Sequence, residues 1–367
     1  MIDLKLRADF VVSQEPFVVK IGDQDDAGYL SEEDIAFVTQ SDGEVHQLNT
    51  RYGGMTIHTK ADDSIAGDVL LCMPNRGVVQ RIFHRASKHN TILFTERCDQ
   101  LCVMCSQPPK NKDYRSLFPL YEKALTLLDQ NTMIGISGGE PTLYKNELLG
   151  IIERVNGSRP DIAYHILSNG QHFKIEDGER LKKLHDKLEL VWGIPLYSHR
   201  QENHDEIVGK VGAFNKVMEN LLFLGSTDAR IELRTVITAE NFLDIPHLAN
   251  FIAKNIPFIM DWAVMAMEPI GYAKANKNRL FIDHTAHPKP LVSAIEICDV
   301  QGIPCHLYNV PLCTMPEAWR DRCVDSIADW KKKFLPECSG CSAIKDCTGF
   351  FEWYDNNWKW SGIKPIP

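Results

Sequence analysis

The chain has 367 residues, of which 44% are hydrophobic and 24% are charged, and its formal net charge is −9. This length allows one large domain with one or two small ones. The acidic balance argues against general binding to nucleic acid or to an anionic membrane, because both attract a basic surface. Met1 to Lys5 lack the basic-then-apolar pattern of a signal peptide, and no apolar run is long enough to span a bilayer. We therefore expect a cytoplasmic protein whose cysteines bind metal or lie buried as thiols rather than form disulfides.

Residues 1–89 are predicted to form a small β-rich domain. Short runs of β-branched and aromatic residues alternate there with turns of Gly and Asp. We predict strands at 10–12, 17–21, 35–38, 55–58, 68–73 and 78–83. The last two flank Pro74-Asn75-Arg76-Gly77, a turn sequence typical of a hairpin. No catalytic constellation is recognisable in this region, so its role is either packing against the next domain or docking of a substrate or partner.

Residues 90–290 alternate strands with helices, the pattern of a parallel α/β barrel. Strands are predicted at 91–96, 133–137, 162–168, 189–194, 231–237 and 259–265, and helices at 120–131, 146–156, 177–187, 214–224 and 245–255. Six strands predict an open, partial (β/α)6 barrel whose wide mouth can admit a macromolecular substrate. In such folds the active residues lie at the C-terminal ends of the strands.

A cysteine motif follows the first of these strands. Cys98, Cys102 and Cys105 have the spacing C-x3-C-x2-C, which places three thiolates on one short loop. A structural zinc site prefers four ligands, whereas an iron–sulfur cube held by three protein thiolates keeps one iron open for a substrate or cofactor. The spacing therefore favours an open iron–sulfur cluster over zinc.

Polar and glycine residues follow the later strands. The second strand ends in a Gly-Gly-Glu turn, whose glycines allow a close approach of the backbone to a ligand and whose Glu140 can accept bonds from a cationic amine. Taken alone, such a turn is more typical of an ordinary strand-to-helix connection than of a ligand site. Arg234, in an apolar run, needs an anionic partner, which is either a ligand or a structural carboxylate near Glu232.

The cysteine loop and the Gly-Gly-Glu turn, in this order and each after a strand, resemble the radical S-adenosylmethionine (SAM) superfamily. The resemblance implies that the three cysteines hold a [4Fe-4S] cluster, that its open iron binds SAM, and that reductive cleavage gives a 5′-deoxyadenosyl radical that removes a hydrogen atom from the substrate. Met104 stands where the family usually has an aromatic residue. By position, the resemblance implies these SAM-binding residues: Ser137, Gly138, Gly139, Glu140, Ser168, Asn169 and Arg234.

Residues 291–367 carry a second group of cysteines with metal-ligand spacing. They are Cys313, Cys338, Cys341 and Cys347. Four thiolates make a closed site, either [4Fe-4S] or zinc, and the spacing does not decide between the metals or exclude Cys323 as the upstream ligand. Beside a radical SAM barrel, this region resembles the truncated SPASM, or twitch, extension with one auxiliary [4Fe-4S] cluster. The full SPASM pattern has a further cysteine where this chain has Phe351.

Nearly the whole chain resembles the His-Xaa-Ser system radical SAM maturases of the HxsC type. The likeness rests on Thr91–Lys110, on the β-rich leader ending in Gly67–Leu71, and on Pro311–Phe351. It implies a ribosomally made precursor peptide as substrate, a companion radical SAM maturase, and a flavodoxin or ferredoxin as electron donor, with no nucleic acid or membrane partner. The expected product is a crosslink or a related modification. Two alternatives remain: a radical SAM enzyme for a small molecule such as a sugar, and a non-catalytic, zinc-stabilised partner subunit.

Overall fold

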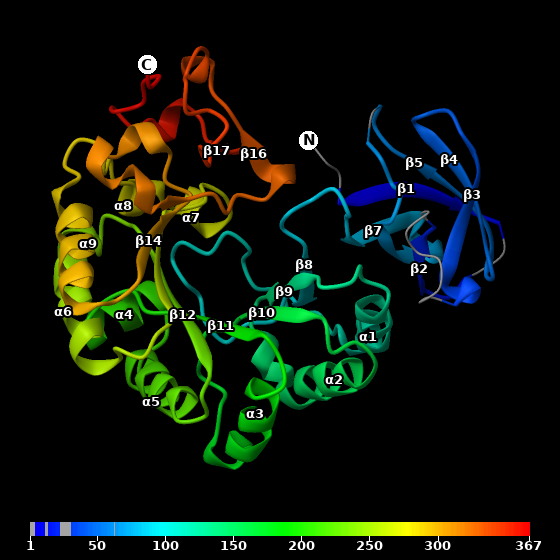
Figure 1. Ribbon diagram of the computed structural model, residues 1–367, viewed down its shortest axis with the longest axis horizontal. Helices are drawn as coiled ribbons and strands as arrows, with labels where there is room; N and C mark the ends of the chain where they lie inside the picture. Colours follow the sequence, from blue (N-terminus) through cyan, green and yellow to red (C-terminus); the bar gives the residue numbers. More distant parts are fainter. Residues whose placement is uncertain (1–3, 12–13, 23–30, 62) are drawn as a thin grey trace.

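The computed structural model describes residues 4–11, 14–22, 31–61 and 63–367. A small closed β-barrel lies at one end of the molecule, and an open parallel sheet with its helices forms the larger part (Figure 1). The last part of the chain lies over one end of the open sheet, above α7 and α8 in Figure 1. None of the described helices is long and apolar enough to cross a membrane.

The small barrel is built from the first seven strands. They are β1 (Lys5–Phe10), β2 (Phe17–Ile21), β3 (Ile35–Ser41), β4 (Val45–Thr50), β5 (Gly53–His58), β6 (Val69–Met73) and β7 (Val78–Phe83). The sheet closes in the order β1-β5-β4-β3-β2-β6-β7 around its own apolar core. The predicted hairpin is confirmed: β6 and β7 pair antiparallel, and Gly77 ends the turn with a φ of 61°. The strand predicted at 10–12 is wrong, because β1 ends at Phe10; residue 12 lies outside the described residues.

The larger part contains a parallel sheet of eight strands in sequential order. They are β8 (Thr91–Thr95), β9 (Met133–Gly138), β10 (Ala163–Leu167), β11 (Leu190–Pro195), β12 (Arg230–Val236), β13 (Asp261–Met265), β14 (Cys305–Tyr308) and β15 (Cys323–Val324). The predicted α/β class with an open, partial parallel barrel is confirmed, and all six predicted strands are present. The sheet has two more strands than predicted, β14 and β15, and both lie beyond residue 290.

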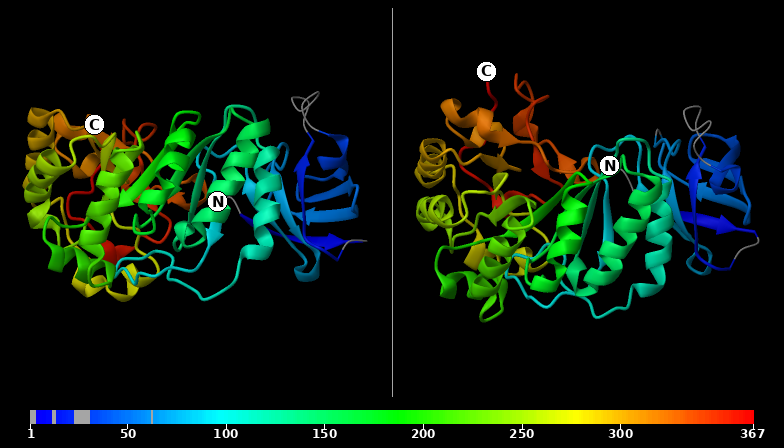
Figure 2. Two further views of the ribbon diagram at one scale, coloured as in Figure 1. Left: turned by 90° about the horizontal axis from the view of Figure 1, so that it is seen from below. Right: turned by 60° about the horizontal axis from the view of Figure 1, so that its bottom comes forward.

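Helices cover the outer face of the open sheet (Figures 1 and 2). The described helices are α1 (Phe118–Thr126), α2 (Lys145–Ser158), α3 (Gly178–His185), α4 (Gln201–Val208), α5 (Ala213–Gly225), α6 (Ile245–Asn255), α7 (Tyr272–Ala275), α8 (Lys277–Leu280) and α9 (Lys289–Gln301). The short helices α7 and α8 are not part of the outer layer, because they follow β13 and pack on the cysteine loop. Successive residues of a strand point to opposite faces. On β12, Ile231 and Leu233 are buried in the core beneath the helices, so Glu232 and Arg234 face the inside of the open barrel.

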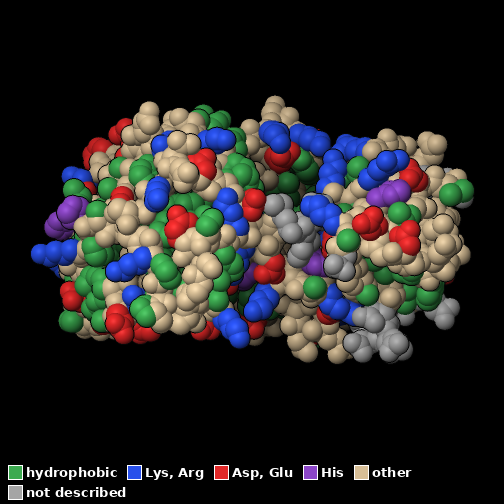
Figure 3. Space-filling view, turned by 90° about the horizontal axis from the view of Figure 1, so that it is seen from above, with side chains coloured by type: hydrophobic (Ala, Val, Ile, Leu, Met, Phe, Trp, Pro, Cys, Tyr) green, Lys and Arg blue, Asp and Glu red, His purple; other side chains and the backbone are tan. Residues whose placement is uncertain are grey.

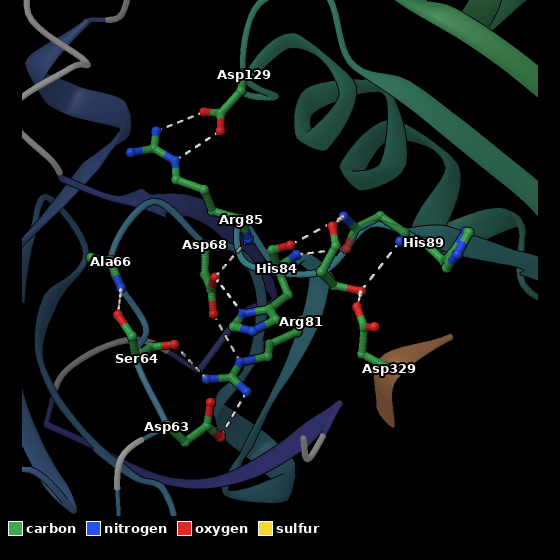
Figure 4. A network of polar contacts seen from close by, with 12 residues as sticks. Asp63, Ser64, Ala66, Asp68, Arg81, His84, Arg85, His89, Asp129 and Asp329 are labelled. Atoms are coloured by element: carbon green, nitrogen blue, oxygen red, sulfur yellow. Dashed lines mark hydrogen bonds and ion pairs between the residues drawn. The ribbon is translucent and has the colours of Figure 1, made fainter. Parts of the chain in front are cut away.

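A network of ion pairs joins the small barrel to the larger part (Figure 4). Asp129, after α1, accepts two bonds from Arg85, at 2.8 and 2.7 Å, and its Oδ1 lies 2.7 Å from Nζ of Lys20, which is fully buried. Asp329 accepts a bond of 3.2 Å from Ser87, in the segment between the two sheets. Basic side chains also gather on the surface along this junction (Figure 3). These contacts fix the small barrel against the edge of the open sheet.

Candidate functional site

The C-terminal ends of β8, β9 and β10 meet at one edge of the sheet, because the three strands are parallel neighbours. The cysteine loop follows β8, the Gly-Gly-Glu turn follows β9, and Ser168 with Asn169 follow β10. The structure brings these predicted groups into contact. Ser168 Oγ donates to Oε1 of Glu140 at 2.8 Å, and Nδ2 of Asn169 donates to Oδ1 of Asp99 at 2.8 Å.

The backbone of the cysteine loop is held on two sides. The N–H groups of Leu101 and Val103 donate to the carbonyls of Val208, at 3.0 Å, and Ile207, at 2.9 Å, at the end of α4. From the other side, Nδ2 of Asn276 donates to the carbonyl of Val103 at 2.8 Å. These bonds position the loop before any ligand binds.

Two glycines permit this close packing around the loop. A Cβ on Gly209, which has a φ of 65°, would lie 2.7 Å from the carbonyl oxygen of Leu101. A Cβ on Gly271, which has a φ of 62°, would lie 2.5 Å from the carbonyl oxygen of Cys105. Both positions therefore require glycine twice over, for the left-handed backbone and for the missing side chain.

The three thiols of the loop lie in an environment that disfavours the charged form. Burial raises the pKa of Cys98 to about 11, and the nearby Glu140, Asp99 and Cys105 add to the effect. Burial raises the pKa of Cys102 and of Cys105 as well. A metal ligand must be a thiolate, so a bound cationic centre would supply the stabilisation that the surroundings lack.

The donors of the cysteine loop are thiols, the ligand type of iron–sulfur clusters. Cys98, Cys102 and Cys105 interact electrostatically with one another, and each is partly exposed. Among the described residues, no group of three or more His, Cys, Asp or Glu side chains is arranged to hold one metal ion. Three thiolates would hold three irons of a cubane and leave the fourth without a protein ligand.

Glu140 has a different environment from the one predicted. Its side chain is completely buried, and Oε1 accepts bonds from the N–H of Thr142 and from Ser168, both at 2.8 Å, while Oε2 accepts the N–H of Asn169 at 2.5 Å. Burial raises the pKa of Glu140, and these bonds oppose the increase. The carboxylate thus joins the ends of β9 and β10, and a direct contact with SAM through it stays a prediction.

The two glycines of the turn are required by packing against the end of β8. A Cβ on Gly138 would lie 2.1 Å from the carbonyl oxygen of Thr95, and a Cβ on Gly139 would lie 2.2 Å from that of Arg97. The N–H of Gly139 donates to the carbonyl of Thr95 at 2.7 Å. Ser137 directly precedes Gly138, the last residue of β9. The close approach predicted for a ligand is therefore already made by the protein's own backbone.

Asp99 forms a polar centre that the sequence analysis missed. Besides Asn169, its carboxylate contacts Nζ of Lys210, and Nε2 of His172 lies 3.3 Å from Oδ2. Burial raises the pKa of Asp99, but the bonds from His172 and Lys210 outweigh it, so the net pKa is lowered. The ionised carboxylate ties the cysteine loop to the ends of β10 and α4. The partners of Asp99 lie in separate segments of the chain, so no local sequence pattern could predict that they meet.

Arg234 lies inside the open barrel, where its partner is Glu232 on the same strand. Burial raises the pKa of Glu232, but the interactions with His165 and Arg234 lower it by a larger amount. The net result is a pKa of about 2. The structure thus supplies the structural carboxylate that was one of the two predicted partners. A contact between Arg234 and SAM stays a prediction.

The second cysteine group lines a small, partly open cavity. Its four cysteines are Cys313, Cys338, Cys341 and Cys347. Two backbone N–H groups approach the sulfurs: Ile366 donates to Cys341 at 3.3 Å and Gly349 to Cys347 at 3.5 Å. Cys323 does not line this cavity and lies on β15, paired with Leu307. Four thiols around one mainly apolar cavity fit a closed metal cluster.

Comparison with known proteins finds similarity in the central part of the chain. Residues 92–252 match the family model of the radical SAM superfamily. The chain is 29% identical over 164 residues to the Fe-coproporphyrin III synthase of Methanosarcina barkeri (strain Fusaro / DSM 804), a match that covers 43% of this chain and 39% of the relative. It is 27% identical over 177 residues to the cysteine-type anaerobic sulfatase-maturating enzyme of Clostridium novyi (strain NT), covering 44% and 46%. The chain thus spans less than half the length of these relatives.

Two solved structures are similar at a lower level. The Streptococcus suis SuiB bound to precursor peptide SuiA has 18% identity and a TM-score of 0.47, over 59% of this chain and 48% of that one. Native anSMEcpe with bound AdoMet and Cp18Cys peptide has 14% identity and a TM-score of 0.45, over 59% and 62%.

Proposed function

From the radical SAM superfamily domain that residues 92–252 form, we propose that this chain is a radical SAM enzyme that modifies a ribosomally made peptide. When bound, a [4Fe-4S] cluster and SAM supply a 5′-deoxyadenosyl radical that removes a hydrogen atom from the substrate. The observation that carries the proposal is the edge where the cysteine loop meets the Gly-Gly-Glu turn, joined through Asp99, Asn169 and Glu140. These three residues connect the loop that would hold the first cluster with the turn that is predicted to bind SAM.

The chain's own residues have distinct roles in this proposal. Cys98, Cys102 and Cys105 hold the first cluster, and the bonds from α4 and Asn276 keep their loop in position. The residues that bind or organise the binding of SAM are Ser137, Gly138, Gly139, Glu140, Ser168, Asn169 and Arg234. Among them, Glu140 acts by ordering the backbone at the ends of β9 and β10, since its oxygens already accept bonds from the protein.

An auxiliary [4Fe-4S] cluster in the C-terminal region is the second part of the proposal. The shared cavity supports Cys313, Cys338, Cys341 and Cys347 as its ligands, and Cys313 rather than Cys323 as the upstream one. The N–H groups of Gly349 and Ile366 would donate to sulfurs of the bound cluster, an interaction that tunes cluster potentials.

The domain organisation belongs to the same proposal: residues 1–89, 90–290 and 291–367. The sheet extends into the last of these through β14 and β15, so the auxiliary site is built directly on the open barrel. A peptide substrate is supported by the maturation activity named for the Clostridium novyi relative. A companion maturase and a flavodoxin or ferredoxin as electron donor complete the proposed partners.

The substrate class is tested with oxygen-free, reconstituted protein, SAM and dithionite. A synthetic peptide carrying His-Xaa-Ser repeats is added in one sample and a mixture of nucleotide-activated sugars in another. We expect 5′-deoxyadenosine formation to rise with the peptide, and the peptide to lose mass by pairs of hydrogen atoms. A rise with the sugars alone would replace the peptide by a small-molecule substrate. Zinc without iron, and no deoxyadenosine in any sample, would contradict the whole proposal.

A further inference from the structure

Ionisable side chains from neighbouring strands gather inside the open barrel, below the edge that carries the cysteine loop. On β13 and β14, Trp262 and Leu307 are buried in the core beneath the helices. Because side chains alternate along a strand, Asp261, His306 and Tyr308 point to the opposite face, into the space that the sheet encloses. The register Ala263↔His306 and Met265↔Tyr308 keeps these strands side by side.

Within this group, Asp261 and His306 form a carboxylate–imidazole pair. Oδ1 of Asp261 lies 2.7 Å from Nδ1 of His306, and Oη of Tyr308 donates to Oδ2 of Asp261 at 3.1 Å. The carboxylate is nearly buried, with 10% of the side chain exposed, whereas 37% of the His306 side chain is exposed. Of the described residues, none bonds Nε2 of His306. The ring is therefore held at one nitrogen and open at the other.

Small residues occupy two inward-facing positions of the neighbouring strands. Ala263 lies beside His306 in the sheet, and Gly193 replaces a side chain on β11. A Cβ on Gly193 would lie 3.0 Å from Cδ of Arg234 and 3.2 Å from Nε2 of His165, so glycine leaves room for both.

The other charged groups of the interior already have partners of opposite charge. Glu232 pairs with Arg234, and its Oε1 lies 3.4 Å from Nε2 of His165. By contrast, the ion-pair partner of Asp261 among the described residues is His306. Among the described residues, Asp261 thus has an imidazole as its ion-pair partner, whereas Glu232 has the permanent cation Arg234.

A histidine held in this way has the arrangement of a general base. A carboxylate at Nδ1 fixes the tautomer, so that Nε2 carries the lone pair, and it stabilises the imidazolium that forms on proton transfer. We propose that His306 is the general base of the reaction and that Asp261 is its positioning residue. The inference rests on the proposed function, since it names the residue that accepts the proton released when the substrate is oxidised.

The step balances in hydrogen and electrons. A C–H bond of the substrate breaks and its hydrogen atom goes to the 5′-deoxyadenosyl radical. Formation of a bond between that carbon and a nitrogen, oxygen or sulfur atom breaks an X–H bond and releases one proton and one electron. The proton goes to Nε2 of His306, and the electron goes to a one-electron acceptor of the iron–sulfur class.

The first test uses the reconstituted full chain with the His-Xaa-Ser repeat peptide, perdeuterated on carbon. In His306→Gln, we expect 5′-deoxyadenosine formation and deuterium transfer into it to stay within about twofold of wild type, while modified peptide per deoxyadenosine falls by about 10²-fold. In Asp261→Asn, we expect a smaller fall and a changed pH profile for peptide modification. The matched control is His58→Gln, because His58 pairs with Asp9 at 2.9 Å on the small barrel and has 34% of its side chain exposed.

An unchanged yield of modified peptide per deoxyadenosine in His306→Gln would overturn the assignment of the base. Absence of deoxyadenosine in the wild type would instead overturn the proposed function. A second readout uses the wild-type chain without turnover: carbethoxylation by diethyl pyrocarbonate, mapped by mass spectrometry. His306 should react, and saturating peptide should lower its reaction relative to that of His58 in the same sample. An equal ratio with and without peptide would also overturn the assignment.

Discussion

Gly271 offers a sharp test of how the fold holds the cysteine loop. The change Gly271→Ala places a Cβ on a residue with a φ of 62° and 2.5 Å from the carbonyl oxygen of Cys105, a residue proposed to bind the first cluster. The left-handed backbone alone costs about 1–2 kcal/mol for a residue other than glycine. The backbone shift needed to relieve the overlap adds about 1–3 kcal/mol. It also strains the bond of 2.8 Å between the N–H of Tyr272 and the carbonyl of Cys105.

The matched control is Gly302→Ala at the end of α9. Gly302 has a φ of 69° and a ψ of 26°, and a Cβ there would meet no atom within 4 Å, so the control carries the cost of an αL residue without the overlap. Gly271 has a ψ of −132°, outside the αL region, and this adds to the cost of its substitution. Urea unfolding of both variants before reconstitution gives the two free energies. We expect Gly271→Ala to lose about 1–3 kcal/mol more than Gly302→Ala, and to hold less iron after reconstitution. Equal losses, with unchanged iron in both variants, would refute the proposed role of this packing.

Three further outcomes are expected. Cys313→Ala should lose about four iron atoms per chain on reconstitution, whereas Cys323→Ala should lose none, because one cubane holds about four; the reverse result would make Cys323 the upstream ligand. Asp129→Asn should lower the free energy of unfolding by about 3 kcal/mol, because its carboxylate contacts the fully buried Lys20 at 2.7 Å. Asp9→Asn on the exposed surface should have a much smaller effect, and similar losses in the two variants would show that the junction is not held by this pair. The pKa of Glu232 is lowered to about 2, so its stabilising contribution is present above its unfolded pKa and is lost as the pH falls through about 2. Urea unfolding should therefore show a higher free energy of unfolding for the wild type than for Glu232→Gln at pH 6, and this difference should become smaller in acid. A difference that does not depend on pH would contradict this explanation.

The regular parts of the fold could be predicted from the sequence because their periodicity is strong. The six central strands are apolar runs buried beneath helices, and the hairpin at 74–77 is defined by its turn residues. β14 and β15 could not be predicted, because they have four and two residues and extend the sheet only through the pairing of β14 with β13 and of β15 with β14. β4 was also missed, since its sequence Val-His-Gln-Leu-Asn-Thr is mostly polar.

The candidate site shows a similar division. The order and spacing of the cysteine loop and the glycine turn indicated which loops meet, since parallel strands bring their ends to one edge. The inward direction of the Glu140 carboxylate and the bonds to Asp99 depend on which side chains face each other across three loops. Spacing carries no information about such contacts. The choice of Cys313 over Cys323 depends in the same way on the shape of one cavity.

The most direct test of the central claim compares the wild type with Cys98/Cys102/Cys105→Ala after oxygen-free reconstitution, with Cys323→Ala as a control for loss of a cysteine. Iron and sulfide per chain are measured, followed by 5′-deoxyadenosine formed from SAM and dithionite. Two cubane clusters predict about eight iron atoms in the wild type and the control, and about four in the triple variant, with deoxyadenosine absent from the triple variant alone. Deoxyadenosine from the triple variant, or a wild type that holds zinc and no iron, would contradict the account.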